Sequence, residues 1–337
     1  MNAFHMYWNP SPEERNFTDY AILTMILSAL QWKAVNDGHL SFYGDRQTVA
    51  YLERLHLAEL WDRCDGTTLD QKIDREHYNV NVFYSIGKFI ALLQECCPCA
   101  MLDMDLIIWQ NISSFLKEKE AAFTHWEDTR ANTIWYCDKE KLPVPPGFQF
   151  HPAWNFKRKA ANTSFMYFNN PRLRDYYVEC AMRYMRDNPC SKKTIGNAGI
   201  LFAEQRLFTM CIDECGDWKK TAPLLDITWN AKKGKFQISR NMPDGWKFFQ
   251  PDNDNIATHT WIAKTQMDKN ERYKSYFCCR LIEKTCSVSP NMEKILVTIT
   301  ALQPYFRLLD QYGTTEQMLD KGVVTKELYE ETQLKSL

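Results

Sequence analysis

The chain has 337 residues, 45% of them hydrophobic and 14% aromatic, which is enough to bury a sizeable core in about two domains. Its 41 basic and 42 acidic side chains are interspersed, and the formal net charge of −1 excludes a broad basic field for sequence-independent binding of nucleic acid. No apolar run approaches the ~18 residues of a transmembrane segment, and the N-terminus lacks the pattern of a secretory signal. We therefore expect a cytoplasmic location, with the twelve cysteines as reduced thiols.

The first hundred residues alternate between strand and helix patterns. Residues 3–8 and 40–44 are apolar or aromatic runs bounded by turn residues, as strands are. Apolar residues at helical spacing predict helices over 19–35, about 47–60 and 80–95. Strand–helix alternation of this kind is typical of βαβ units around a mostly parallel sheet.

The stretch Cys99–Trp109, CAMLDMDLIIW, is apolar apart from Asp103 and Asp105. An apolar run of this kind predicts a strand buried on both faces. In a strand, residues i and i+2 point to the same side, so Asp103 and Asp105 would share one face. Uncompensated carboxylates are costly there, so they need a cation, a hydrogen-bonding partner or a strand end open to water. A divalent cation that both aspartates bind meets this need. The motif is short enough to arise by chance, and a second copy at 252–254 lies in the polar stretch QPDNDN, which we interpret as a solvated loop.

Polar residues also follow the other early strands. In parallel sheets, ligands bind beyond the carboxyl ends of the strands. Trp8 and Asn9 follow the first strand, and Tyr43 and Asp45 stand at the end of the second. We expect these four to contact a nucleotide base, although Gly44-Asp45 equally fits an ordinary turn.

The remaining chain is mixed. It predicts short strands or loops and several helices, with the C-terminal part mostly helical. The expected strands are 121–126, 131–136, 164–168 and short ones within 222–258. Residues 222–258 also contain a turn at Lys233-Gly234. The expected helices are 171–186, 199–213 and those of 266–337.

Four local motifs occur in a characteristic order. SIGKFIALLQE, with Lys88, precedes the aspartate stretch; NTSF begins at Asn162; FAEQRLF spans 202–208; and THTW contains His259. With the Asp-x-Asp motif, this order resembles the GT-A glycosyltransferases. It is more closely similar to an uncharacterised bacterial group of GT-A-like proteins with the same NTSF, FAEQ and late-histidine order. The resemblance covers roughly residues 3–265.

The resemblance implies a GT-A fold, a mixed and mostly parallel sheet flanked by helices, in residues 1–265. Its nucleotide-binding half would be about 1–110 and its acceptor half about 111–265, with a helical extension over 266–337. It also implies that Asp103, Asp105 and His259 bind Mn²⁺ or Mg²⁺; a neutral imidazole ligand suits manganese better than magnesium. A plain core histidine is the alternative for His259.

The resemblance further assigns residues to donor and acceptor. Lys88, Lys264 and Asp103 would face the donor, together with the base contacts Trp8, Asn9, Tyr43 and Asp45. Asn162, Ser164 and Gln205 would face the sugar and acceptor, and the serine stands where the family has glycine. Glu204 is the candidate general base if the reaction inverts configuration; a glutamate favoured by a helix N-terminus is its alternative.

The resulting expectation is a metal-dependent, hexosyltransferase-like glycosyltransferase that moves a sugar from a UDP- or GDP-sugar to a carbohydrate or other hydroxyl acceptor. Two alternatives stay open. A catalytically silent protein could have kept the fold for binding. A nucleotidyltransferase would also use paired aspartates, but Asn9-Pro10-Ser11-Pro12 lacks the glycine- and lysine-rich phosphate loop that it needs.

Overall fold

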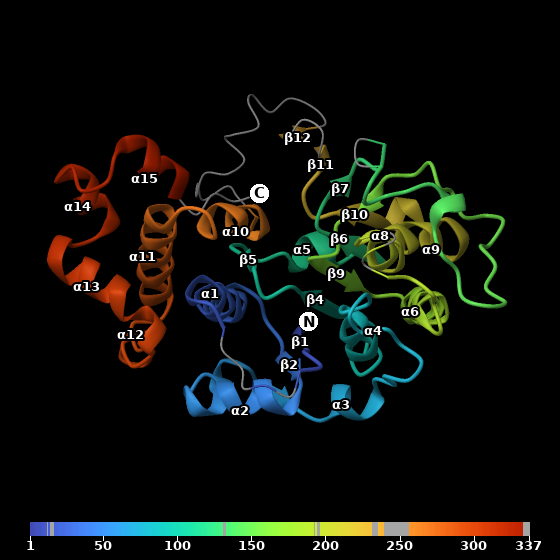
Figure 1. Ribbon diagram of the computed structural model, residues 1–337, viewed down its shortest axis with the longest axis horizontal. Coiled ribbons are helices and arrows are strands. Elements are labelled where there is room, and N and C mark those ends of the chain that lie inside the picture. The colour runs from blue at the N-terminus through green and yellow to red at the C-terminus, as the bar shows by residue number, and fades with distance from the viewer. Residues whose placement is uncertain are drawn as a thin grey trace.

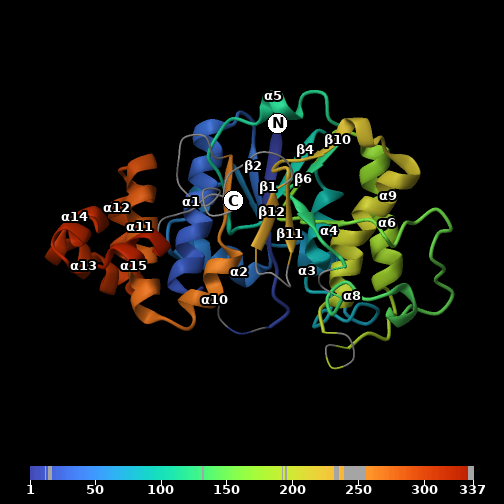
Figure 2. The ribbon, with the colours of Figure 1, turned by 90° about the horizontal axis from the view of Figure 1, so that it is seen from above.

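The computed structural model describes residues 1–11, 13, 17–130, 133–191, 193, 196–230, 235–238 and 256–332. The second Asp-x-Asp copy at 252–254 and the Lys233-Gly234 turn lie outside these ranges. The described chain forms three layers, with a central sheet between two groups of helices (Figures 1 and 2).

The central sheet is mixed and mostly parallel, as the sequence predicted. Its seven strands run in the order β10-β6-β9-β4-β1-β2-β3, and only β9 is antiparallel to its neighbours. The strands are β1 (Asn2–Tyr7), β2 (Leu40–Gly44), β3 (Arg63–Asp65), β4 (Cys99–Leu102), β6 (Ala121–Phe123), β9 (Phe165–Phe168) and β10 (Thr221–Pro223).

Two smaller sheets lie beside this one. One pairs β5 (Leu106–Ile108) with β13 (Ala257–His259), and the other has the order β12-β11-β7-β8. The strands of the second are β7 (Trp126–Glu127), β8 (Ala160–Ala161), β11 (Ile227–Asn230) and β12 (Lys235–Ile238).

Helices cover both faces of the central sheet. On one face lies α1 (Asp19–Val35), and on the other lie α4 (Ile86–Leu92), α6 (Pro171–Met185) and α9 (Leu207–Cys215) (Figure 2). The shorter helices of this part are α2 (Arg46–Arg54), α3 (Thr68–Lys72), α5 (Ser113–Leu116), α8 (Ala198–Leu201) and α10 (Trp261–Met267). Strand residues alternate between the two cores accordingly, since Ala100 and Leu102 of β4 pack on the α1 side and Met101 packs on the α4 side.

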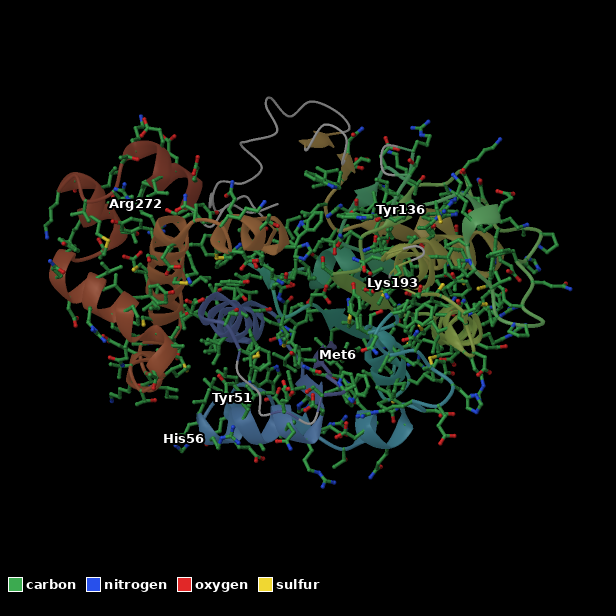
Figure 3. All side chains as sticks on the ribbon, viewed as in Figure 1. Met6, Tyr51, His56, Tyr136, Lys193 and Arg272 are labelled. Carbon is green, nitrogen blue, oxygen red and sulfur yellow. The ribbon has the colours of Figure 1, made fainter. Side chains whose placement is uncertain are left out.

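The C-terminal part is helical, as predicted, and α1 connects it to the sheet. Its helices are α11 (Glu271–Val288), α12 (Met292–Leu296), α13 (Gln303–Tyr312), α14 (Thr315–Asp320) and α15 (Lys326–Thr332). Because α11 covers the side of α1 that faces away from the sheet, α1 is buried on nearly all sides, and one continuous core joins the two parts. Figure 3 places Arg272 of α11 at the far end of the molecule from Tyr136. Among the described helices, none is long and apolar enough to cross a membrane.

Several predicted boundaries were wrong. The helix expected over 47–60 ends at Arg54, because the chain turns at His56 with φ 55°, and only a 3-10 turn over Ala58–Leu60 follows. Of the helix expected over 80–95, only Ile86–Leu92 is helical. Residues 133–136, the described part of the strand expected over 131–136, form a turn and bend.

Candidate active site

The two aspartates lie in a turn, not within one continuous strand. Strand β4 ends at Leu102 and β5 begins at Leu106, and the Leu106 N–H closes the turn by donating to the Asp103 carbonyl at 3.0 Å. The prediction of a single strand over Cys99–Trp109 was therefore wrong. The chain leaves the central sheet here, because β5 pairs with β13 in a different sheet.

Backbone hydrogen bonds attach this turn to two distant segments. The Asp103 N–H donates to the Ser164 carbonyl at 2.7 Å, just before β9 begins. On the other side, the Thr260 N–H donates to the Asp105 carbonyl at 3.0 Å, and His259 stands opposite Leu106 in the β5–β13 ladder. The late histidine, more than 150 residues away in sequence, is thus held beside the aspartates.

Asp103, Asp105 and His259 form a cluster that could hold a metal ion. A carboxylate oxygen of each aspartate and a ring nitrogen of His259 all lie within 4.8 Å of one another. Ligand atoms around one Mg²⁺ ion are at most roughly 4.2 Å apart, so small side-chain movements would bring these three onto one ion. His259 is 8% exposed and stacks on Trp261, and its Nδ1 has no hydrogen-bond partner in the described part of the chain. Two carboxylates and an imidazole are therefore a suitable ligand set.

Lys88 joins Asp103 to Glu204. It lies in the first turn of α4, and its Nζ is 2.7 Å from Asp103 Oδ1 and 2.6 Å from Glu204 Oε1. Burial alone would lower the pKa of Lys88, but the two carboxylates outweigh it and raise the pKa. Burial raises the pKa of Asp103, against the opposing effect of Lys88. Lys88 is thus a fixed cation between two carboxylates.

Lys264 and His259 face Asp105. Lys264, on α10, places its Nζ 2.6 Å from Asp105 Oδ2, and His259 Nε2 is 3.6 Å from the same oxygen. Burial would raise the pKa of Asp105, but His259 and Lys264 overcome this and hold it well below the ordinary range. The Lys264 side chain is 40% exposed, so it can leave Asp105 for another partner.

The cluster contains more carboxylates than lysines. Asp103, Asp105 and Glu204 share the ammonium groups of Lys88 and Lys264, and His259 is a further partner of Asp105 that carries a charge only when it is protonated. The side chains of Asp103, Asp105 and Glu204 are 27%, 13% and 8% exposed, so the excess negative charge is only partly solvated. A site of this kind favours a further cation.

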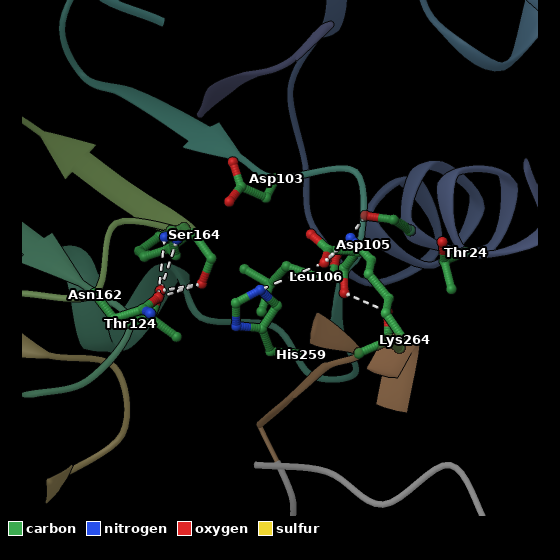
Figure 4. A network of polar contacts seen from close by, with 12 residues as sticks. Thr24, Asp103, Asp105, Leu106, Thr124, Asn162, Ser164, His259 and Lys264 are labelled. Atoms are coloured by element: carbon green, nitrogen blue, oxygen red, sulfur yellow. Dashed lines mark hydrogen bonds and ion pairs between the residues drawn. The ribbon is translucent and has the colours of Figure 1, made fainter. Parts of the chain in front are cut away.

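Asn162 and Ser164 are buried in a hydrogen-bonded turn between β8 and β9. The Asn162 side chain accepts from the Ser164 N–H and hydroxyl at 3.2 and 2.8 Å and donates to Glu127 Oε1 at 3.1 Å. Ser164 Oγ also lies 2.7 Å from Thr124 Oγ1. Figure 4 shows Asn162 and Ser164 beside the aspartate turn. Their side chains stabilise the turn between β8 and β9.

Glu204 and Gln205 lie on a π-helical turn, Phe202–Arg206, between α8 and α9. Thr163 donates to Glu204 Oε1 at 2.8 Å, the Tyr177 hydroxyl donates to the Glu204 carbonyl at 2.7 Å, and the Tyr136 hydroxyl donates to Gln205 Oε1. Single π turns inside helices frequently occur at functional sites. The turn brings the Glu204 carboxylate to Lys88.

Glu127 is a buried carboxyl group that the sequence analysis did not select. It lies on β7, is 4% exposed, and burial raises its pKa to about 8 despite the hydrogen bond from Asn162. The Glu127-Asp128 pair reads as an acidic turn, so no local signal marked it. Thr163 was also missed, although its place between Asn162 and Ser164 could have pointed to it.

The four expected base contacts take part in other interactions. Tyr43 is fully buried, and its hydroxyl donates to Glu95 at 2.7 Å. Asp45 caps α2, because its carboxylate accepts hydrogen bonds from the Thr48 N–H and hydroxyl, both at 2.8 Å. The same carboxylate accepts from the Asn9 N–H at 3.1 Å. Trp8 is 6% exposed and donates to Asp70 at 3.0 Å. Of these four, only Asn9 has a partly exposed side chain. The structure therefore gives Trp8, Tyr43 and Asp45 structural contacts, and their role as base contacts stays a prediction.

Three comparisons with known proteins give one kind of match. No family model matches the sequence, and no curated protein matches it significantly. Among solved structures, mouse xyloside xylosyltransferase 1 is similar with 16% identity and a TM-score of 0.35, over 67% of this chain and 85% of that one. Galactosyltransferase LgtC is similar with 12% identity and a TM-score of 0.36, over 67% of this chain and 73% of LgtC. PaToxG glycosyltransferase is similar with 12% identity and a TM-score of 0.32, over 63% of this chain and 68% of PaToxG.

The likeness to these three structures is partial. Because the identities and TM-scores are this low, we interpret the site from this chain's own residues.

Proposed function

We propose that this protein is a glycosyltransferase that moves a sugar from a nucleotide-sugar donor to a hydroxyl acceptor, with a divalent cation bound by Asp103, Asp105 and His259. The observation that carries the proposal is the cluster itself. Three suitable ligands from two distant segments meet at the carboxyl edge of β4, in a site with an excess of carboxylates. In α/β proteins this edge is where nucleotides bind.

The bound cation would neutralise the diphosphate of the donor and stabilise it as a leaving group. Lys264 supports the same role, because its 40% exposed side chain can move from Asp105 toward a phosphate. Lys88 is less free, since it bridges two carboxylates, and we assign it to holding Asp103 and Glu204 on the donor side.

Glu204 is our candidate catalytic base for an inverting reaction. Its carboxylate is oriented by Lys88 and Thr163, so it is held in one position while it accepts a proton from the acceptor hydroxyl. Gln205 would bind acceptor hydroxyls next to it. Asn162 and Ser164 would shape the sugar side through the turn that they stabilise.

Two alternatives predict different behaviour. A silent protein with this fold would bind neither metal nor nucleotide through the cluster. A nucleotidyltransferase would release pyrophosphate from a nucleoside triphosphate. The segment after β1 has no glycine-rich phosphate loop, which disfavours this second alternative.

The test is thermal unfolding with UDP or GDP, each with and without MnCl₂ or MgCl₂. At a ligand concentration of 100 times the dissociation constant, binding stabilises the folded state by about 2.7 kcal/mol, which raises the melting temperature by several degrees. We expect this rise only when nucleotide and metal are both present. Its absence for both nucleotides with both metals would contradict the proposal. Release of UDP or GDP from UDP- or GDP-sugars then tests transfer or hydrolysis directly.

A further inference from the structure

Large hydrophobic side chains are rarely exposed in this protein. In the described part of the chain, they are Tyr84, Leu93, Ile134, Trp135 and Val297, each at least 43% exposed. Three of these five belong to two loops next to the site residues Lys88 and Gln205: Tyr84, Ile134 and Trp135. Exposed apolar groups gathered beside a polar site mark a surface that binds a ligand.

Tyr84 stands at the entrance to α4. It directly precedes Ser85, the N-cap of that helix, and lies one turn before Lys88. Burial raises the pKa of its hydroxyl, and the nearby Glu204 carboxylate raises it further, while Lys88 acts in the opposite direction. The Tyr84 side chain therefore starts within one helical turn of Lys88, and 47% of it stays open to solvent.

Trp135 and Ile134 belong to a loop that contacts the π-helical turn at Gln205 and Arg206. They precede Tyr136, which is 5% exposed and donates its hydroxyl hydrogen to Gln205. The next residue, Cys137, is buried, and its carbonyl accepts from Arg206 Nη1 at 2.6 Å. Two consecutive contacts with the π-helical turn thus anchor this loop, while Trp135 is 43% and Ile134 80% exposed. Figure 3 shows Tyr136 among the helices on the α8–α9 side of the sheet.

Aromatic rings beside carboxylate and amide groups match the chemistry of a sugar ring. A pyranose has a face of C–H groups, which can pack on an aromatic ring, and an edge of hydroxyls, which need hydrogen-bond acceptors. Glu204 and Gln205 supply acceptors, and Tyr84 and Trp135 supply rings. A flexible acceptor without a ring, or a peptide hydroxyl, would use the rings less well.

We propose that Tyr84 and Trp135, with Ile134 beside them, form an aromatic platform that binds a carbohydrate acceptor by its ring face next to Glu204 and Gln205. This proposal rests on the proposed glycosyltransferase function and narrows its acceptor class to sugars. The two aromatic residues bind and orient the acceptor; they take no part in proton transfer.

The experiment measures the binding of lactose, maltose and cellobiose, at up to 50 mM, to the full chain with Mn²⁺ and UDP. Ligand-observed NMR gives the affinity, and the change in intrinsic fluorescence that is lost in Trp135→Ala gives an independent signal. We expect Tyr84→Ala and Trp135→Ala each to weaken the binding of at least one disaccharide by about tenfold, the value of one good aromatic contact. Tyr84→Phe and Trp135→Tyr keep a ring and should stay within about threefold of the wild type.

Matched controls separate this site from a general effect of lost surface hydrophobicity. Leu93→Ala and Val297→Ala remove side chains of similar exposure, 48% and 44%, and should leave disaccharide binding unchanged. Glycerol, which offers hydroxyls without a ring face, should not compete. In all variants, the metal-dependent affinity for UDP or GDP should equal that of the wild type, because the platform contacts the acceptor only.

The proposal is overturned if no disaccharide binds the wild type, or if the alanine variants bind as tightly as it does. It is also overturned if these variants instead abolish a concentration-dependent dimer, since the surface would then be a contact between copies. Disaccharide binding that depends on Tyr84 and Trp135 in a protein that binds no nucleotide would support the platform while refuting the proposed function.

Discussion

Two acidic clusters of this protein differ in one informative way. In the first, Asp19 at the start of α1 joins the C-terminal helices to the rest of the chain. It accepts from the Tyr305 hydroxyl and from the Tyr20 N–H at 2.8 Å, and Lys274 Nζ lies 3.7 Å away. In the second, Asp103, Asp105 and Glu204 share two lysines. Both clusters are mostly covered and both contain lysine.

The difference lies in how completely each carboxylate is satisfied. Asp19 has a hydroxyl, a backbone N–H and an ammonium group around one charge, which is the environment of a structural ion pair. The second cluster has two lysines for three carboxylates, and although His259 Nε2 lies 3.6 Å from Asp105, its Nδ1 has no hydrogen-bond partner in the described ranges. An incomplete set of partners thus distinguishes a candidate binding site from a structural contact, even where the residue types are the same.

The largest expected effect is that of Asp105→Asn. Asparagine keeps the shape of the side chain but removes the charge that would hold the cation. The affinity for Mn²⁺ in the presence of UDP should therefore fall by at least about 100-fold. Loss of a residue that only hydrogen-bonds to a metal ligand already costs up to about 100-fold in metal affinity, and loss of a ligand should cost more. Asp103→Asn should weaken binding less. Titration calorimetry measures both.

The matched control for this prediction is Asp19→Asn. It should lower the melting temperature, because the contact between α1 and the C-terminal helices loses its charge, and it should leave Mn²⁺ affinity unchanged. Unchanged nucleotide affinity in Asp105→Asn would mean that the two clusters are both structural.

Glu204→Gln should lower the rate of transfer by about 10²–10⁴-fold, the usual contribution of a general base, with nearly normal donor affinity. The measurement compares kcat with the dissociation constant of the donor. Glu120→Gln is a suitable control, because Glu120 also pairs with a lysine, Lys220, at 3.3 Å but at the opposite edge of the sheet. Near-normal turnover in Glu204→Gln would make Glu204 a structural partner of Lys88.

Lys264→Met should make the site bind Mn²⁺ alone more tightly. The Lys264 ammonium group is 2.6 Å from Asp105 Oδ2 and competes with a metal for that oxygen. Its removal should raise the affinity for metal severalfold while weakening that for the nucleotide diphosphate. Electron paramagnetic resonance of free Mn²⁺ gives the first value and calorimetry the second. Lys269→Met, an exposed lysine just beyond α10, should change neither; weaker metal binding in Lys264→Met would exclude the competition.

The smallest expected effect concerns Glu127. Burial raises its pKa from 4.5 to about 8, so the folded state binds this proton more tightly than the unfolded state does. Its contribution to stability is therefore present below pH 4.5 and is lost as the pH rises through 8. Glu127→Gln removes this loss, so its melting temperature relative to the wild type should rise between pH 5 and pH 9. Glu140→Gln, at an exposed position, is the control: its difference in melting temperature from the wild type should be the same at pH 5 and pH 9. A pH-independent difference for Glu127→Gln would place a solvated carboxylate at that position.

Local sequence determined much of this protein. Apolar runs and helical spacing were enough to predict β1, α1, β2, α6 and the mostly parallel sheet, because burial of one face fixes the period of a strand or helix. The order of the four motifs also selected Asp103, Asp105, His259, Lys88 and Glu204, which the structure brings together. Their residue types carried that information, since carboxylates, imidazole and lysine in apolar surroundings need partners.

Only the tertiary structure decided which partner each group has. The pairing of β5 with β13 carries His259 to Asp105, and the π-helical turn carries Glu204 to Lys88; both depend on contacts more than 100 residues apart that no local pattern specifies. The tertiary structure likewise decided the contacts of two residues at the end of β2. Tyr43 and Asp45 lie at a strand end, but packing buries one against Glu95 and uses the other to cap α2. Glu127 gains its raised pKa from burial alone, and burial is a property of the folded chain.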